Sequence, residues 1–292
     1  MAVLIEEPAN AKINLTLRVH GQRPDGYHEI ESLVVFAHYG DRLALHPGAA
    51  VSLRLTGAFA ADIVGTNLLE TTMQRLALAA PGLRLGSVEL EKNLPVAAGL
   101  GGGSVDAAAL LRAIRRATPE AAPAVDWLAV AQGLGADVPV CLRGAPALMW
   151  GIGECIVPLP ALPEAWVVLA NPRLPLTAGD VYRRLGAGPV PQMMHAPEMQ
   201  SFPAIDDLVA YAAARGNDLE SAAIALCPQI ADVKAALAAA PGALMVRMSG
   251  SGPTCFALFA TPAHADAAAA AIARREPGWW VVATQIAGAG AP

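Results

Sequence analysis

The chain has few charged residues and no excess of basic ones. Charged residues make up 15% of its 292 residues, hydrophobic residues make up 54%, and the formal net charge is −5. Disordered chains lack this much apolar content, and nucleic-acid-binding domains usually carry a basic patch or stripe. The composition therefore predicts a packed globular protein with no nucleic-acid partner.

Long apolar runs and paired cysteines are also missing. No apolar stretch reaches the roughly 18 residues that cross a bilayer, and residues 1–10 carry Glu6 and Glu7 where a secretory signal would be basic. We therefore expect no membrane partner and a cytoplasmic location. The four cysteines stand far apart, which predicts free, mostly buried thiols rather than a zinc site: Cys141, Cys155, Cys227 and Cys255.

Lysine is scarce. Of 20 basic residues only Lys12, Lys92 and Lys234 are lysines. Arginine cannot supply a compact, titratable ammonium group, so each lysine that is present is a candidate functional residue.

Apolar periodicity predicts a mixture of strands and helices. Residues 11–17 alternate apolar and polar, as in a half-buried strand, and on periodicity alone Lys12 faces outward. Further strands are expected over 30–37, 41–46, 51–55, 88–90, 147–150, 166–169, 244–248, 255–260 and 279–284. Helices are expected over 68–78 with Asn67 as N-cap, 104–116, 126–133, 205–214, 218–225, 230–239 and 263–275.

Two domains are expected, an N-terminal domain over 1–160 and a C-terminal domain over 161–292. A proline-rich connector at 158–163 suggests the boundary. The segment 185–202, rich in Pro, Gly and Met, is predicted to be an irregular loop.

A glycine-rich run stands between the strand predicted at 88–90 and the helix predicted at 104–116. Glycines let backbone N–H groups approach phosphate oxygens, and the following helix offers unpaired N–H groups and the positive end of its dipole. A tight strand-to-helix turn without a ligand is the alternative. The run lacks the lysine of a P-loop and breaks the Rossmann spacing. The predicted ATP-binding residues are Pro95, Val96, Ala97, Ala98, Gly99, Leu100, Gly101, Gly102, Gly103, Ser104 and Val105.

Three separated segments resemble the three sequence motifs of the GHMP kinases. They are residues 8–15 (PANAKINL), 95–104 (PVAAGLGGGS) and 248–256 (MSGSGPTCF). The resemblance spans nearly the whole chain and implies a two-domain α+β fold with the active site in the interdomain cleft. It also implies ATP with Mg²⁺. We find no second carboxylate for the metal, so we assign no protein ligand to it.

Three further segments resemble sequence motifs of those GHMP kinases that act in the non-mevalonate isoprenoid pathway. These are residues 11–15 (AKINL), 21–28 (GQRPDGYH) and 135–139 (GADVP). The resemblance implies that ATP phosphorylates the 2-hydroxyl of a methylerythritol linked to cytidine diphosphate.

The resemblance also assigns two catalytic residues. An Asp in a Gly-Ala-Asp turn usually caps the turn, but the family pattern makes Asp137 the general base. It makes Lys12 the ammonium group that keeps this carboxylate ionised and stabilises the developing alkoxide.

Other residues are assigned to ligand binding. The resemblance places Tyr27 and His28 on the cytosine, with Tyr182 as a second stacking ring, and Asn14 near the reacting end of the substrate. In the third motif, the glycine turn is expected to contact the substrate through Gly250, Ser251 and Gly252. Asn67 is expected to lie near the nucleotide base. Val105 departs from the family pattern, where many relatives have a second Ser.

Three alternatives stay open. The chain could phosphorylate another alcohol, as homoserine or mevalonate kinases do, although Tyr27, His28 and Asp137 favour the cytidine-linked acceptor. It could be a non-catalytic binding protein on the same fold, or a structural domain whose glycine runs are turns. The sequence leaves open whether the chain is a monomer or a homodimer.

Overall fold

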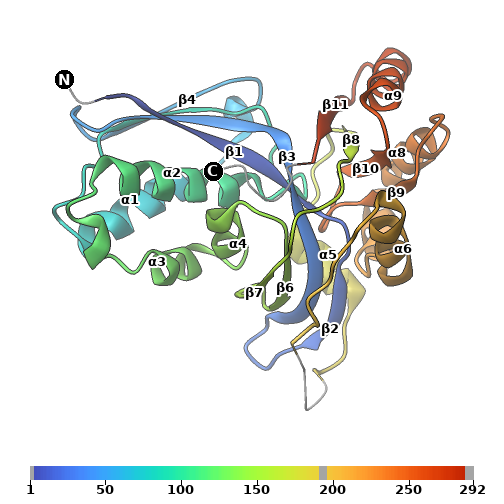
Figure 1. Cartoon of the computed structure of the whole chain (residues 1–292), viewed down its shortest axis with the longest axis horizontal. Coiled ribbons are helices and arrows are strands. Elements are labelled where there is room, and N and C mark those ends of the chain that lie inside the picture. Colours follow the sequence, from blue (N-terminus) through green and yellow to red (C-terminus); the bar gives the residue numbers. More distant parts are fainter. Residues whose placement is uncertain (1–2, 191–195, 287–292) are drawn as a thin grey trace. The chain divides into compact units, whose positions relative to one another are not determined.

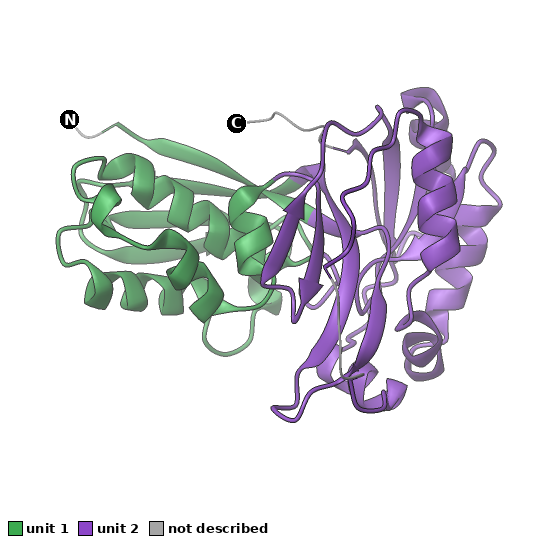
Figure 2. Cartoon of the chain, turned by 60° about the horizontal axis from the view of Figure 1, so that its bottom comes forward, with its two compact units in different colours: residues 1–11, 40–96, 101–144 green, residues 12–39, 97–100, 145–292 purple. Residues whose placement is uncertain are grey.

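The structure, a computed structural model, describes residues 3–190 and 196–286. The chain forms two compact units, each made of several segments (Figure 2). Unit 1 contains residues 1–11, 40–96 and 101–144, and unit 2 contains 12–39, 97–100 and 145–292. Two strands, β1 (Ile5–Asn14) and β3 (His28–His46), have residues in both units.

Unit 1 combines strands with α-helices (Figure 1). Strand β5 (Ser87–Glu91) pairs in antiparallel fashion with the last residues of β3 and in parallel with β4 (Ser52–Thr56). The helices are α1 (Leu68–Ala79), α2 (Gly102–Ala117), α3 (Trp127–Leu134) and α4 (Val138–Arg143), with single 3₁₀ turns at Ala60–Asp62 and Ala122–Ala124. Helix α2 forms the core of this unit, because its alanines, Leu110, Leu111 and Ile114 are buried.

Unit 2 is built on a four-stranded antiparallel sheet in the order β11-β8-β10-β9. Side chains of α5, α7, α8 and α9 pack with β8 and β10 into one hydrophobic core, and all five residues of β10 are buried. The strands are β8 (Trp166–Asn171), β9 (Met245–Met248), β10 (Cys255–Phe259) and β11 (Trp280–Gln285). The helices are α5 (Ala178–Leu185), α6 (Ile205–Arg215), α7 (Glu220–Leu226), α8 (Gln229–Ala238) and α9 (Pro262–Arg275).

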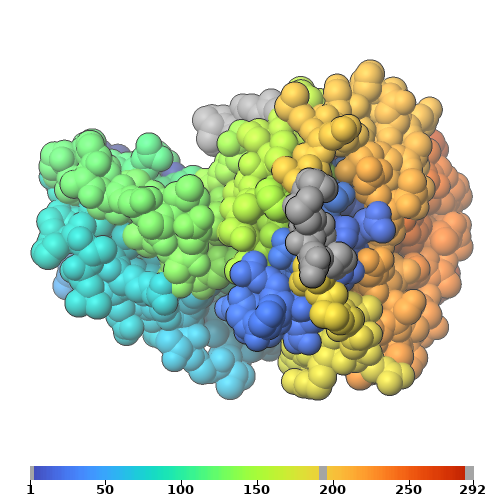
Figure 3. Space-filling view, turned by 90° about the horizontal axis from the view of Figure 1, so that it is seen from below, coloured from blue at the N-terminus to red at the C-terminus, as the bar shows by residue number. Residues whose placement is uncertain are grey.

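A second group of strands in unit 2 surrounds the first half of β3. Strands β2 (Arg18–Gln22) and β6 (Ala147–Gly151) pair with β3, and β7 (Cys155–Pro158) extends the sheet from β6. The chain after α5 joins β2, where the Gln22 N–H donates to the Gly188 carbonyl over 2.7 Å. Figure 3 shows this blue N-terminal segment beside the yellow segment that follows α5.

The predicted α+β fold is confirmed, with local corrections. Residues 28–46 form one strand where two were expected, and α2 begins at Gly102, inside the glycine run. Helices α4 and α5 and strands β2 and β7 were not expected, and Asp137 lies in the predicted turn, which leads into α4 with Asp137 as its N-cap. The predicted loop at 185–202 lies partly outside the described residues. The domain boundary near residue 160 stays a prediction.

Two further expectations were tested. All four cysteines are free, and all except Cys155 are buried, as expected. Within residues 3–190 and 196–286, no helix has the length and apolar content needed to cross a membrane.

The N-cap of α1 provides a stability prediction. The Asn67 side-chain oxygen accepts a hydrogen bond from the Leu69 N–H, and the Glu70 carboxylate accepts one from the Asn67 N–H. Asn67→Ala removes the cap and should lower the free energy of unfolding by about 1 kcal/mol in urea denaturation. Asn67→Asp retains a capping carboxylate and should stay within a few tenths of a kcal/mol of the parent. Equal stability of the Ala and Asp variants would contradict a capping role.

Candidate functional site

The second part of the segment that resembles the first GHMP motif, from Ala11 on, is buried on both faces, and the burial continues to Leu17. The exposed fractions are 4% for Lys12, 2% for Asn14 and 1% for Thr16. The alternation over 11–17 predicted a half-buried strand with Lys12 facing outward, and that expectation was wrong. Buried polar groups need hydrogen-bond partners, so the segment forms a polar interior rather than one face of a half-buried strand.

Asn14 is the centre of this polar interior. Its side-chain Nδ2 donates to Ser32 Oγ over 2.7 Å, and its backbone N–H donates to Ser249 Oγ over 3.1 Å. Ser32 in turn donates to the Thr16 carbonyl over 2.5 Å. Asn14 Oδ1 is buried and has no hydrogen-bond partner among the described residues. Such an unsatisfied atom points to a ligand donor.

The first half of the glycine loop lies in unit 2, against the third motif. Ser249 Oγ donates to the Gly99 carbonyl over 2.9 Å, the Thr254 N–H donates to the Ala98 carbonyl over 3.3 Å, and the Lys12 N–H donates to the Leu100 carbonyl over 3.0 Å. Gly99 has φ +71°, and a side-chain carbon there would overlap the Ser249 carbonyl oxygen. Only glycine satisfies both constraints, which explains its place in the motif.

The second half of the loop opens helix α2 in unit 1. Gly101 is the N-cap in the left-handed region, at φ +66°, and no acidic side chain lies in the first turn. The first N–H groups of a helix lack intrahelical acceptors and carry the positive end of its dipole. Gly103 is exposed and Ser104 is half-buried. This end of the helix is therefore suited to bind an anion such as phosphate.

The ends of the predicted ATP loop differ in exposure. Val96 and Ala97 are exposed, whereas Pro95 is buried. Val105 is 2% exposed, and its N–H donates to the Gly101 carbonyl. The Val105 side chain therefore packs in the core, and its role in binding ATP stays a prediction.

A buried ionic cluster lies beside the start of α2. The Lys92 ammonium donates to Asp41 Oδ2 and, over 2.7 Å, to Asp106 Oδ2. A side-chain carbon at Gly102 would lie 3.6 Å from Lys92 Nζ. All three charged side chains are at least 96% buried, so the cluster links the residue after β5 with β3 and α2.

Two carboxylates share the single ammonium of this cluster, so their protonation is coupled. Burial raises the pKa of Asp106 to about 8, Lys92 opposes the rise and the charge of Asp41 adds to it. Burial acts to lower the pKa of Lys92, but Asp106 and Asp41 raise it above its ordinary value. Burial therefore favours the protonated form of the Asp106 carboxyl group beside the charged Lys92 ammonium.

The two predicted catalytic residues lie in different units. Lys12 belongs to unit 2, and half-buried Asp137, the N-cap of α4, belongs to unit 1. The Asp137 side chain makes no capping hydrogen bond to α4. The pairing of Lys12 with Asp137, like the location of the site in a cleft, stays a prediction.

Two of the predicted cytosine-binding residues lie together in unit 2. The rings of His28 and Tyr182 have centroids 4.6 Å apart and planes inclined by 30°. Burial lowers the pKa of His28, which favours a neutral imidazole. Tyr27 precedes His28 and is 57% exposed. His28 is the first residue of β3 and Tyr182 lies in α5, a helix that was not expected from the sequence.

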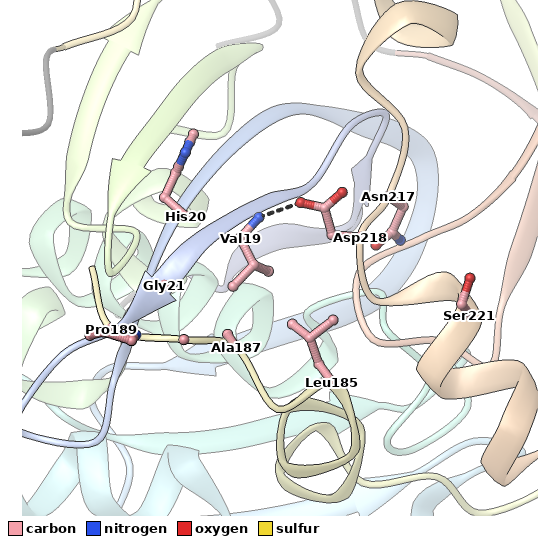
Figure 4. Close-up of a pocket in the computed structure, with 10 residues that line it drawn as sticks. Val19, His20, Gly21, Leu185, Ala187, Pro189, Asn217, Asp218 and Ser221 are labelled. Atoms are coloured by element: carbon pink, nitrogen blue, oxygen red, sulfur yellow. Dashed lines mark hydrogen bonds between the residues drawn. The ribbon is translucent and has the colours of Figure 1, made fainter. Parts of the chain in front are cut away.

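The turn of the third motif is anchored by a residue that sequence reasoning missed. Asn217 Nδ2 donates to the carbonyls of Met248, over 2.9 Å, and Gly250, over 2.8 Å. Gly250 and Gly252 are buried, and Ser251 is half-buried. Asn217 also lines a pocket of about 500 Å³ beside β2 (Figure 4), in which Asp218 accepts a hydrogen bond from the Val19 N–H.

Comparison with known proteins identifies the family. The sequence models for the GHMP kinase N-terminal domain and C-terminal region match residues 63–145 and 196–278. A 4-diphosphocytidyl-2-C-methyl-D-erythritol kinase of Cereibacter sphaeroides is 50% identical over 287 residues, covering 98% of this chain and all of the relative. The chain belongs to this family of GHMP kinases. A second kinase of the same name, from Parvibaculum lavamentivorans, is 46% identical over 97% of the chain and 99% of its own length.

Solved structures agree with this assignment. The crystal structure of a 4-(cytidine 5'-diphospho)-2C-methyl-D-erythritol kinase is 34% identical to this GHMP kinase, with a TM-score of 0.75, over 98% of this chain and 100% of that one. Homoserine kinase from Cytophaga hutchinsonii, 20% identical, has a TM-score of 0.67 over 97% of this chain and 95% of its own. At that identity the second match shows the shared fold alone.

The ionic cluster makes unfolding dependent on pH. The pKa of Asp106 rises from 3.8 to about 8 on folding, so its contribution to stability is complete below pH 3.8 and is lost as pH rises towards 8. Between pH 6 and 8 this carboxyl should lower the free energy of unfolding by up to about 1.4 kcal/mol per pH unit, and the loss should level off above pH 8.

Chemical denaturation from pH 6 to 9 measures this effect. Asp106→Asn should remove this slope, because an amide does not titrate. The matched control is Asp232→Asn, which replaces an exposed carboxylate on α8 and should leave the slope unchanged. Parallel pH profiles for the parent and Asp106→Asn would show that the cluster does not titrate in this range.

Proposed function

We propose that this kinase transfers the γ-phosphoryl group of ATP to the 2-hydroxyl of 4-(cytidine 5'-diphospho)-2-C-methyl-D-erythritol. The observation that carries the proposal is the 50% identity, over nearly full length, to a kinase named for that substrate. The local geometry supports it, because a glycine loop opens the N-terminus of α2 and a polar interior surrounds Lys12 and Asn14.

The proposed reaction needs a base and stabilisation of charge. Asp137 takes the proton of the 2-hydroxyl while the oxygen of that hydroxyl forms a bond to the γ-phosphorus of ATP. The bond between the γ-phosphorus and the β,γ-bridging oxygen breaks, which releases ADP. The Lys12 ammonium stabilises the developing alkoxide and the ionised form of Asp137. The N–H groups at the start of α2 bind phosphate oxygens of ATP.

We assign the metal to the nucleotide. In the part of the chain that the structure describes, no three or more His, Cys, Asp or Glu side chains group as a metal site. Mg²⁺ usually binds through few protein ligands together with substrate phosphates. We therefore infer that Mg²⁺ arrives with ATP and would neutralise phosphate charge there.

The cytidine group is proposed to bind at the aromatic pair. His28 and Tyr182 place two rings within stacking distance of each other, and Tyr27 adds a third, exposed ring. A base gains stacking energy of about 1–3 kcal/mol from such rings. The neutral imidazole of His28 also offers one donor and one acceptor to the edge of a cytosine.

The proposed cellular location of the enzyme rests on its cosubstrate and on its cysteine thiols. We propose a cytoplasmic enzyme, because ATP is its phosphoryl donor and its cysteines are free. The net charge of −5 supports action on a small molecule without a nucleic-acid partner.

Removing either proposed catalytic group should abolish most turnover while the fold persists. Asp137→Asn should lower kcat about 10²- to 10⁴-fold, because the amide cannot accept the proton. Lys12→Met, which keeps an apolar stem in a buried position, should lower kcat about 10²- to 10³-fold. ADP release measures turnover and circular dichroism checks folding.

Asp232→Asn removes a carboxylate on α8, outside the proposed site, and should retain parental turnover. A folded Asp137→Asn enzyme with parental kcat would exclude Asp137 as the essential base.

Cytosine recognition is tested by removing the base from the substrate. The free methylerythritol phosphate should react with kcat/KM about 10- to 100-fold below that of the cytidine-diphosphate-linked substrate, because it forgoes base stacking. Tyr182→Ala should shrink this ratio. Equal rates on both substrates would rule out the aromatic pair as the base site.

A further inference from the structure

Two buried serines hold Asn14 from different directions. Ser32 Oγ accepts from the Asn14 side-chain Nδ2, and Ser249 Oγ accepts from the Asn14 backbone N–H. Both serines are 0% exposed. Ser32 directly precedes an apolar run in β3 that begins with Leu33 and Val34, and Ser249 follows the last residue of β9. Backbone groups, not hydroxyls, pair the strands of a sheet, so the contacts of these hydroxyls to Asn14 need another explanation.

The hydrogens of both hydroxyls are already committed. Ser32 donates its hydrogen to the Thr16 carbonyl, and Ser249 donates its hydrogen to the Gly99 carbonyl. A serine has one hydroxyl hydrogen, so neither serine can donate to Asn14. An amide flipped about its last bond would set its oxygen against Ser32 Oγ, acceptor against acceptor. The network therefore fixes the direction of the Asn14 carboxamide.

The fixed amide leaves one acceptor unused. Asn14 Oδ1 is buried without a partner in the described structure, and leaving such an atom unpaired costs about 1–3 kcal/mol. A side-chain carbon at Gly250 would lie 3.2 Å from this oxygen and 3.0 Å from the Gly99 carbonyl oxygen. The unused acceptor therefore lies where the third motif meets the first half of the glycine loop.

We propose that Ser32, which fixes the Asn14 carboxamide, and Ser249, which fixes the Asn14 backbone, are positioning residues that present Oδ1 as an acceptor, so that Asn14 selects a ligand group that donates. This inference rests on the proposed function. A phosphate oxygen only accepts hydrogen bonds and is disfavoured there, whereas a hydroxyl of the polyol can donate. In the methylerythritol part of the proposed substrate the non-reacting hydroxyls are those on C1 and C3, and one of them is the partner of Asn14 Oδ1.

Deoxy substrates test the proposal. The measured quantity is the ratio of kcat/KM for the full substrate to that for its 1-deoxy or 3-deoxy analogue. The parent enzyme should show a ratio of about tenfold or more for one analogue, because that analogue leaves the buried acceptor unpaired. Asn14→Ala should bring this ratio below about twofold. Ser32→Ala should bring it below about threefold, because the amide is then free to turn.

A further variant keeps the test decisive if Ser32→Ala does not fold. Ser249→Ala should reduce the same ratio and also raise the KM for ATP, because Ser249 holds Gly99 as well. Thr118→Val is the matched control: it removes a fully buried hydroxyl that accepts from the Arg84 N–H in unit 1, and its ratio should equal that of the parent.

The outcomes separate the two proposals. A parent enzyme that turns over the full substrate but does not discriminate against either deoxy analogue would overturn the role of Asn14 Oδ1. Unchanged discrimination in both folded serine variants would overturn the positioning role. A parent enzyme without activity on the full substrate would overturn the proposed function itself, and this inference with it.

Discussion

The hydroxyl of Ser249 holds three segments that are distant in the sequence. It accepts a hydrogen bond from the N–H of Asn14, 235 residues away, and donates one to the carbonyl of Gly99, 150 residues away. Because Ser249 is fully buried, water cannot replace these bonds. The first motif, the first half of the glycine loop and the third motif thus meet in unit 2 through one atom, which fixes the backbone position of Asn14.

The glycine loop performs two structural tasks with its two halves. Its first half is fixed by hydrogen bonds to Ser249, Thr254 and Lys12, whereas its second half begins a helix and leaves N–H groups for a ligand. The Lys92 ammonium beside Gly102 does not replace the missing P-loop lysine, because Asp41 and Asp106 surround it. The attraction for phosphate therefore comes from the helix end and from groups that reach the ligand from elsewhere.

The sequence predicted the family and much of the fold because the relevant signals are local. Motif strings, the N-cap at Asn67 and the apolar spacing of α2 are read from neighbouring residues, and the family assignment is confirmed. Periodicity failed at Lys12, Asn14 and Thr16, since it assumes that polar side chains face water. The roles of Ser32 and Ser249 had no local signal, because their partners lie 16 to 235 residues away.

The chain alternates between the two units five times, which constrains how the protein is made. Unit 1 is complete at residue 144, but unit 2 needs residues 12–39 together with strands that end at Gln285. Leu17, for example, pairs with Asn217. At a synthesis rate of about 5–20 residues per second, the early strands wait on the order of ten seconds or more for their partners. During translation, the segment that carries Lys12 and Asn14 is therefore among the first made and the last to be buried.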